Sequence, residues 1–242
     1  MLKSFAISIL ILLLVNSCKK ADVKIYTMPS PPIVIPPADT GTAKTYLALG
    51  DSYTIGQSVP VADRFSVQAA TSLTAGGTKF SAPEIIAQTG WTTANLLNTL
   101  AAAPPAKTTY DIVTLLIGVN NQYQHRTQQE YNDQFSILLN KAIAYAGNNK
   151  KRVIVLSIPD YGVTPYAAGS NRAEIAKDID AFNLINKNIT TQAGVTYLDI
   201  TGYSRLAAND ASLTASDGLH PSGIEYKLWA DALVPLITAA LK

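Results

Sequence analysis

The 242-residue sequence contains one cysteine and two histidines, which limits the chemistry open to it. A single cysteine excludes a disulfide framework and a cysteine-rich metal site. Two histidines exclude a histidine-rich metal centre, so any histidine-dependent reaction must use His125 or His220. Charged residues make up only 15% of the chain, and we find no basic cluster beyond Lys150, Lys151 and Arg152. We therefore expect neither a disordered chain nor a nucleic-acid-binding protein.

Several catalytic motifs are also missing. The chain has no GxSxG elbow, no GxGxxG fingerprint, no GxxxxGK(S/T) phosphate loop and no HExxH helix. Their absence argues against typical α/β-hydrolases, dinucleotide-dependent enzymes, P-loop NTPases and zincins. A catalytic site in this chain must therefore use another arrangement of residues.

The first 17 residues resemble a bacterial export signal. Lys3 precedes an apolar run from Phe5 to Val15, a length typical of a signal peptide and shorter than the roughly 20 residues that span a bilayer. The only cysteine, Cys18, ends the sequence Val-Asn-Ser-Cys, which resembles a lipobox, in which the cysteine is lipidated and begins the mature chain. We expect an exported lipoprotein anchored to a membrane through Cys18, in the periplasm or on the outer surface. A buried strand or helix is the alternative for the apolar run.

Residues 18–43 differ in composition from the segments on either side. Prolines are dense between residues 28 and 37, where they favour extended polyproline II conformation over helix or sheet. We expect a semi-rigid tether, with a proline-rich recognition peptide as the alternative. Residues 44–242 contain no internal repeat and no obvious second domain, which predicts a single domain.

From residue 44 onward, short apolar segments alternate with segments of helical periodicity. The pattern predicts strands at residues 45–49, 84–88, 111–117, 152–158 and 195–199. It predicts helices at residues 64–73, 93–102, 127–145, 172–191 and 222–241, the last of them kinked by Pro235. Apolar strands separated by helices indicate an α/β fold: a central parallel five-stranded sheet covered on both faces, in a three-layer α/β/α sandwich.

The residues that could carry out a reaction follow the predicted strands. Ligands of such folds bind beyond the carboxyl ends of the strands, and Ser52, Gly90 and Asn120 follow the first three. A serine nucleophile needs a base, and Asp217-Gly-Leu-His220 supplies one, because a carboxylate three residues before an imidazole can hold its Nδ1–H and turn Nε2 toward the serine. Each piece alone is more typical of an ordinary turn. Together they predict nucleophilic catalysis.

Four motifs, in chain order, resemble those of the SGNH or GDSL hydrolase family. They are GDSYTIG at residues 50–56, QTGWTT at 88–93, GVNN at 118–121 and DGLHP at 217–221. The resemblance extends over residues 45–241. It implies the flavodoxin-like sandwich of that family, hydrolysis of acyl esters through an acyl-serine, and no requirement for a metal or organic cofactor.

The resemblance also implies roles for individual residues. Ser52 would be the nucleophile, His220 the base and then the acid, and Asp217 the orienting carboxylate. The oxyanion hole would consist of the backbone N–H groups of Ser52 and Gly90 and the side-chain amide of Asn120. We expect glycine at position 90 because its N–H must approach the substrate closely and a Cβ would intrude.

Roles or positions are also predicted for three further polar residues. Asn121 stands where the family has Asp, and an amide can still support the loop. Asp51 is expected to hydrogen-bond loop N–H groups as a support that is lost in acid. His125 lies in a polar stretch and is expected at the surface or at the rim of the pocket.

The substrate is less visible in the sequence. Four aromatic residues follow strands and are candidates for the substrate-binding wall, with plain packing as the alternative: Trp91, Tyr123, Tyr161 and Tyr166. For an exported enzyme, the family resemblance implies that the substrates are carbohydrate O-acetyl esters or lysophospholipid-type esters. Thioesters are the least expected substrates. A non-catalytic surface binding protein that keeps the fold is the alternative from another class, and loss of a triad residue would be its signature.

Overall fold

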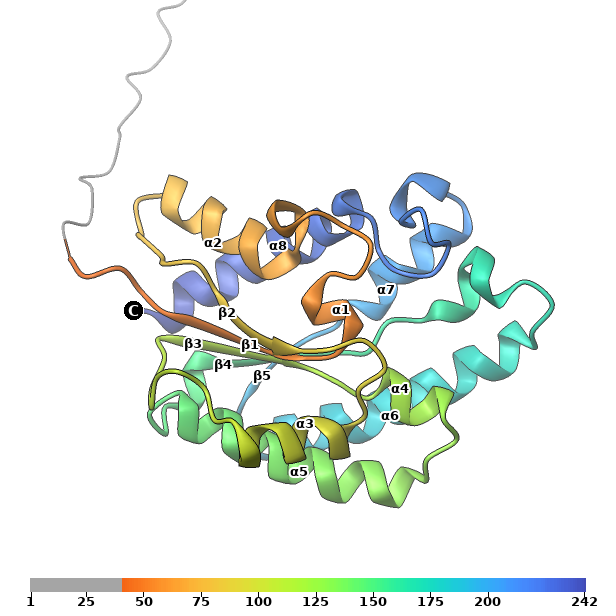
Figure 1. The fold of residues 1–242 in the computed structure, drawn as a ribbon, viewed down its shortest axis with the longest axis horizontal. Helices are drawn as coiled ribbons and strands as arrows, with labels where there is room; N and C mark the ends of the chain where they lie inside the picture. The colour runs from red at the N-terminus through yellow and green to blue at the C-terminus, as the bar shows by residue number, and fades with distance from the viewer. Residues whose placement is uncertain (1–40) are drawn as a thin grey trace, which may run out of the picture. The chain divides into compact units, whose positions relative to one another are not determined.

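Five parallel strands form one sheet in the centre of the protein (Figure 1). The computed structural model describes residues 41–242; the predicted signal segment, Cys18 and nearly all of the predicted tether lie outside the described residues. The spatial order of the strands is β2 (Glu84–Ala87), β1 (Tyr46–Gly50), β3 (Ile112–Leu116), β4 (Val153–Leu156) and β5 (Thr196–Leu198). This 2-1-3-4-5 order is that of flavodoxin-like folds, in which the switch in strand order lies between β1 and β3. The predicted fold class is confirmed.

Helices cover both faces of the sheet (Figure 1). One face carries α1 (Ser52–Ile55), α2 (Phe65–Ala75), α7 (Thr201–Ser204) and α8 (Gly223–Ala240). The other carries α3 (Thr93–Ala102), α5 (Gln128–Tyr145) and α6 (Arg172–Gln192), with the short α4 (Val119–Tyr123) following β3. Six 3₁₀ helices lie in the connections of the described region: η1 (Val61–Asp63), η2 (Lys150–Arg152), η3 (Tyr161–Val163), η4 (Pro165–Ala167), η5 (Arg205–Ala208) and η6 (Ala211–Leu213).

All ten strands and helices predicted from periodicity are present in the structure, with ends that differ by no more than two residues. The three shortest α-helices were not predicted, because four or five residues are too few for a helical period to show. The final helix continues through Pro235 without interruption. Pro235 therefore does not end the helix, and the kink expected at this residue stays a prediction.

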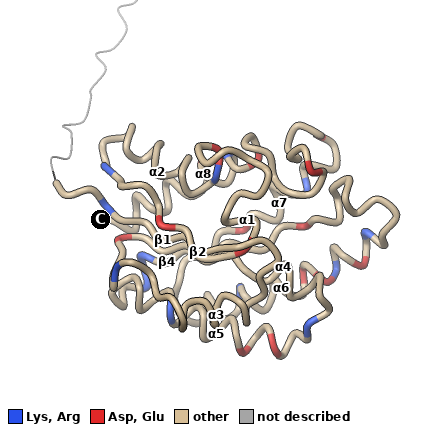
Figure 2. The backbone as a smooth tube through the Cα atoms, viewed as in Figure 1, with Lys and Arg blue, Asp and Glu red and all other residues tan. Residues whose placement is uncertain are grey.

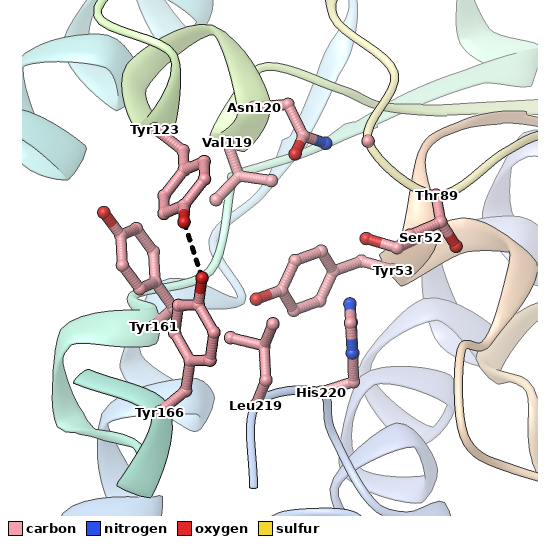
Figure 3. A pocket seen from close by; sticks show the side chains of 11 residues that line it. Ser52, Tyr53, Thr89, Val119, Asn120, Tyr123, Tyr161, Tyr166, Leu219 and His220 are labelled. Carbon is pink, nitrogen blue, oxygen red and sulfur yellow. Dashed lines mark hydrogen bonds between the residues drawn. The ribbon is translucent and has the colours of Figure 1, made fainter. Parts of the chain in front are cut away.

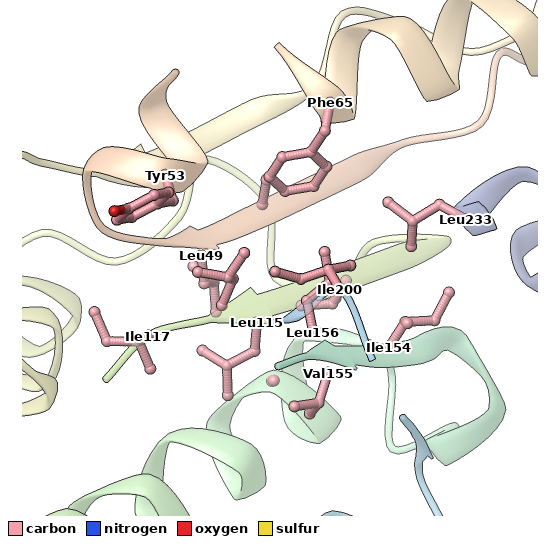
Figure 4. Close-up of a cluster of buried hydrophobic side chains, with 14 of the residues drawn as sticks. Leu49, Tyr53, Phe65, Leu115, Ile117, Ile154, Val155, Leu156, Ile200 and Leu233 are labelled. Carbon is pink, nitrogen blue, oxygen red and sulfur yellow. The ribbon is translucent and has the colours of Figure 1, made fainter. Parts of the chain in front are cut away.

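The core lies on both faces of the central strands (Figure 4). Every residue of β1, β3 and β4 is buried, whereas the edge strands β2 and β5 are half-buried. Phe65 of α2 packs on Trp229 of α8, with ring centroids 6.0 Å apart. Full burial of a large apolar side chain contributes about 1.5–3 kcal/mol. The central strands are thus fixed by packing, and their carboxyl ends supply rigid positions for the loops that follow.

Charges are sparse and of both signs along the backbone of the described region (Figure 2). No helix within residues 41–242 is long and apolar enough to cross a membrane.

Candidate active site

Ser52 is the first residue of α1 and follows β1 after a single intervening residue, Asp51. Asp51 caps this helix: its Oδ1 accepts the N–H of Tyr53 at 3.0 Å, and its carbonyl accepts the N–H groups of Thr54 and Ile55. The N–H of Ser52 is not among these bonds, so it is the donor that the first turn leaves for another acceptor. The sequence thereby places both the hydroxyl and the N–H of Ser52 at the end of β1.

The tight approach of α1 to the sheet requires glycine before the cap. A Cβ on Gly50 would lie 2.3 Å from the carbonyl oxygen of Leu116 in β3 and 2.0 Å from Oγ1 of Thr54. No larger residue fits without moving the strand or the helix that begins at Ser52. The position of the serine therefore depends on the close contact of β1 with β3.

Asp217 and His220 form a turn before α8. Oδ1 of Asp217 accepts the N–H groups of Leu219 and His220 at 2.9 and 3.0 Å, and Oδ2 lies 2.7 Å from Nδ1 of His220. Ser58 donates a further hydrogen bond of 2.6 Å to the same Oδ2. Partial burial alone would raise the pKa of Asp217, but the hydrogen bonds from Ser58, His220 and the two N–H groups outweigh it and hold this pKa well below its ordinary value. An ionised Asp217 keeps the proton of the imidazole on Nδ1.

The imidazole of His220 is buried beside the serine. Its ring packs against the ring of Tyr53, with centroids 5.0 Å apart, and both residues line one pocket with Ser52 (Figure 3). Among the described residues no hydrogen bond joins Ser52 to His220. Hydrogen bonds between catalytic groups are often long before substrate binds. The arrangement brings Ser52, His220 and Asp217 to one site.

Asn120 reaches the same pocket from α4, directly after β3. Its Nδ2 donates to the carbonyl oxygen of Trp91 at 3.0 Å, which uses one of its two hydrogens and fixes the direction of the other. Gly90 also lines the pocket, and its carbonyl accepts a 3.1 Å hydrogen bond from Nε2 of Gln124 in the loop after α4. The predicted oxyanion donors thus lie together at the ends of three neighbouring strands.

The backbone gives a second reason for glycine at position 90, besides the expected close approach to the substrate. A Cβ there would meet no other atom of the protein within 4 Å, so packing within the protein does not require glycine. The backbone φ of Gly90 is +82°, a left-handed conformation that other residues rarely adopt. Glycine is therefore required to turn the chain after β2.

Asn121 supports the neighbouring loop from a fully buried position. Its Oδ1 accepts the N–H of Thr93 at 3.0 Å, and its Nδ2 donates to Oγ1 of the same threonine at 2.7 Å. The hydroxyl of Thr93 in turn donates to Gln134 of α5. An amide satisfies both atoms of Thr93, which explains how Asn serves at this position.

The sequence comparison decides the family. Residues 48–228 match the GDSL-like Lipase/Acylhydrolase family. The chain belongs to this family. Its members are carboxylic ester hydrolases, so the chain is an enzyme of that class. No curated protein matches the chain significantly.

Solved structures with the same fold have low sequence identity. TesA is 17% identical, with a TM-score of 0.64 over 82% of this chain and 100% of its own. A lipase/acylhydrolase from Enterococcus faecalis is 18% identical, with a TM-score of 0.61 over 82% and 97% of the two chains. An acetylxylan esterase from Geobacillus stearothermophilus is 17% identical, with a TM-score of 0.60 over 81% and 95%. At this level the likeness establishes the shared fold.

In this GDSL-like hydrolase the candidate active-site pocket has a volume of about 110 Å³ and a mostly apolar wall. The wall consists of Tyr53, Val119, Tyr123, Tyr161, Tyr166 and Leu219 (Figure 3). Trp91, predicted as a wall residue, instead packs its half-buried side chain against the core and contributes its carbonyl to Asn120. His125 is exposed, which agrees with the predicted surface position; it does not line the pocket of Ser52 but a second, neighbouring cavity.

Two buried carboxyl groups, those of Asp51 and Glu225, lie near Tyr53. Burial raises the pKa of Asp51 to about 7, against the effect of the N–H groups of Tyr53 and of Asp51 itself. Burial likewise raises the pKa of Glu225 to about 8. Oδ2 of Asp51 and Oε1 of Glu225 have no hydrogen-bond partner among the described residues. The expected role of Asp51 as a support lost in acid is therefore wrong: its neutral form is favoured as pH falls, and ionisation is the disfavoured change.

Sequence reasoning missed three residues of the site. Ser58 contacts Asp217 across 159 positions of sequence, and a lone loop serine gives no local sign of such a contact. Tyr53 belongs to the first motif, yet its packing on His220 depends on the turn before α8. Glu225 follows His220 by five residues, and only its place in the first turn of a buried helix could have marked it. Within residues 41–242 no group of three or more His, Cys, Asp or Glu side chains is placed to hold a metal ion.

Proposed function

We propose that this chain hydrolyses carboxylic esters through an acyl-serine formed on Ser52, with His220 and Asp217 completing a triad. The observation that carries the proposal is the 2.7 Å contact of Asp217 with Nδ1 of His220, in a turn whose imidazole shares one pocket with Ser52 and Asn120. The contact leaves Nε2 as the only ring nitrogen free to act on the serine.

In the first half of the reaction, Nε2 of His220 removes the proton of Ser52 as Oγ attacks the ester carbonyl. The carbonyl oxygen becomes an oxyanion, for which the N–H groups of Ser52 and Gly90 and the amide of Asn120 are the proposed donors. The imidazolium is stabilised by the ionised Asp217. It then gives its proton to the departing alcohol, and the acyl group remains on Oγ.

In the second half, water takes the place of the alcohol. His220 removes a proton from the water, whose oxygen attacks the acyl carbon. The same donors stabilise the second oxyanion, and the C–O bond to Ser52 breaks as His220 returns its proton to Oγ. The products are a carboxylic acid and the restored serine.

Two substrate classes are proposed, and the pocket favours one. Its volume of about 110 Å³ suits a short acyl group such as acetyl better than the long chain of a lysophospholipid. A structurally similar protein is an acetylxylan esterase, which agrees with this choice. We therefore favour O-acetylated carbohydrates, with lysophospholipids second.

The test compares esters with and without a serine-reactive phosphonate. The wild-type protein should hydrolyse p-nitrophenyl acetate and lose this activity when the phosphonate reacts with Ser52. It should release acetate from acetylated xylan faster than it releases fatty acid from lysophosphatidylcholine. Ser52→Ala should take up no phosphonate. A folded wild-type protein that turns over none of the three esters would instead support a non-catalytic surface binding protein.

We also propose that the enzyme is an exported lipoprotein anchored through Cys18, on the strength of the lipobox-like sequence alone. Mass spectrometry of the native protein should show a chain that begins at Cys18 and carries acyl groups. Cys18→Ser should release an active protein into the soluble fraction. An unmodified Cys18, or an intact segment 1–17, would contradict the anchor.

A further inference from the structure

The wall of the pocket includes three tyrosines that interlock. Tyr123 comes from α4, whereas Tyr161 and Tyr166 come from η3 and η4. Their ring centroids lie 5.9, 6.2 and 6.5 Å apart, and the hydroxyl groups of Tyr123 and Tyr166 meet at 2.5 Å (Figure 3). We refer to Tyr123 and Tyr166 as the tyrosine clasp.

The clasp connects the two halves of the catalytic site. On one side, α4 carries both Asn120 and Tyr123. On the other, the backbone N–H of Tyr166 donates to the carbonyl of Gly218 at 2.8 Å, within the turn that holds Asp217 and His220. The hydroxyl contact thus closes the pocket between the predicted oxyanion donor and the acid–base turn.

Behind these rings lies a second cavity of about 290 Å³. It shares Tyr123 and Tyr161 with the active-site pocket, so their rings form the partition between the two spaces. The lining of the second cavity combines apolar surface with the carboxylates of Glu174 and Asp178, which do not favour an alkyl chain beside them. A straight acyl chain that is too long for the first pocket therefore meets the tyrosine rings first, and behind them a cavity that contains two carboxylates.

The clasp is accessible and weakly held. The side chains of Tyr123 and Tyr166 are each 48% exposed, whereas Tyr161 is buried. An exposed hydrogen bond contributes little net stability, on the order of a factor of three to ten in an equilibrium. Removal of one hydroxyl should thus loosen the clasp without disturbing the fold.

We propose that the tyrosine clasp determines acyl-chain specificity: it confines the enzyme to esters of short carboxylic acids. Tyr123 and Tyr166 are specificity residues and do not take part in bond making. This inference rests on the proposed esterase function, since it names the acyl group that the same pocket accepts.

The experiment measures kcat/KM for p-nitrophenyl acetate and p-nitrophenyl octanoate and follows their ratio. Wild type should prefer the acetate by more than about tenfold, since each methylene that a pocket accepts or refuses is worth about that much. Tyr123→Phe and Tyr166→Phe should each raise the octanoate-to-acetate ratio about threefold to tenfold. The double variant should match the single ones, because both remove the same contact. Tyr123→Ala, which removes the partition itself, should raise the ratio further.

Tyr145→Phe is the matched control, because Tyr145 lies at the end of α5 and does not line the pocket. Its ratio should equal that of wild type, and melting curves should show all variants folded. The inference is overturned if wild type hydrolyses both esters equally, if Tyr123→Ala keeps the wild-type ratio, or if the effects of the two Phe substitutions add. If wild type hydrolyses neither ester, the proposed esterase function is wrong, and the inference that rests on it is wrong as well.

Discussion

Two aspartates belong to the candidate site, and their surroundings shift their pKa values in opposite directions. Asp217 lies in a surface turn, where its side chain is 28% exposed and receives hydrogen bonds from Ser58, His220 and two backbone N–H groups. Asp51 is completely buried, with one oxygen bound to the N–H of Tyr53 and the other without a partner in the described part of the chain. The first is held as an anion, and the second keeps its proton until about pH 7.

The two aspartates differ in what they contribute: Asp217 is proposed to supply a negative charge to the reaction, whereas Asp51 holds the backbone in place. In the proposed mechanism the anion of Asp217 stabilises an imidazolium, and the donors of the turn keep this carboxylate ionised. Asp51 is needed to cap a four-residue helix, and one oxygen is sufficient for that. Neighbouring acids in one site therefore have separate duties, which the number of their donors reveals.

The largest expected effect follows from removing the charge of Asp217. Asp217→Asn keeps the size of the side chain, but its amide no longer fixes the proton of His220 on Nδ1. We expect kcat for p-nitrophenyl acetate to fall by about 10³ to 10⁴. Asp51→Asn keeps the cap oxygen and is the matched control. If kcat, measured at pH 6, fell by a similar factor in both variants, the proposed difference in role between Asp217 and Asp51 would be wrong.

The buried acids should instead control stability. Because their folded-state pKa values are raised, they stabilise the fold most at low pH, and this contribution declines as pH rises from about 4 to between 7 and 8. The free energy of unfolding in urea should fall between pH 5 and pH 8 by on the order of a few kcal/mol. The double variant Asp51→Asn, Glu225→Gln should show a flatter profile.

An exposed carboxylate provides the control for this profile. Asp133→Asn on α5 should leave the pH dependence of stability as in wild type. If the buried double variant and wild type lost equal stability over the same pH range, the two buried acids would not be the protons involved.

A smaller effect is expected from Ser58, the donor that Asp217 receives from outside its own turn. Ser58→Ala removes a 2.6 Å hydrogen bond and raises the pKa of Asp217 toward its ordinary value. We expect kcat to fall about threefold to tenfold, with KM unchanged, because the bond acts on the imidazolium formed in the transition state. Ser58→Thr, which keeps the hydroxyl, should recover most of the rate. A change in KM alone would place Ser58 in substrate binding.

The smallest effect tests a third acid, introduced at position 121. In Asn121→Asp the new carboxylate still accepts the N–H of Thr93 but cannot donate to its hydroxyl. The hydroxyl of Thr93 has one proton, which it can donate either to this carboxylate or to Gln134, but not to both. We expect a loss of about 1 kcal/mol in unfolding free energy at pH 8. Unchanged stability would show that Gln134 reorients to restore the bond.

The sequence predicted what depends on local pattern. Continuous apolar runs marked the buried strands, and the residues at their ends, Ser52, Gly90 and Asn120, were located because strand ends meet at one edge of a parallel sheet. It did not predict what depends on contacts between distant segments. Ser58, Tyr53 and the orientation of Trp91 are set by packing of loops from different strands, for which a single sequence has no periodic sign.

The parallel sheet also has a kinetic consequence. None of its strand pairs is a hairpin, and β1 pairs with β3, which begins at residue 112, while β1 begins at residue 46. Contacts between such distant segments form slowly, because loop closure must precede them. Ser52 and Asn120 stand at the ends of those two strands. Recovery of esterase activity during refolding would therefore report the moment at which the two central strands join.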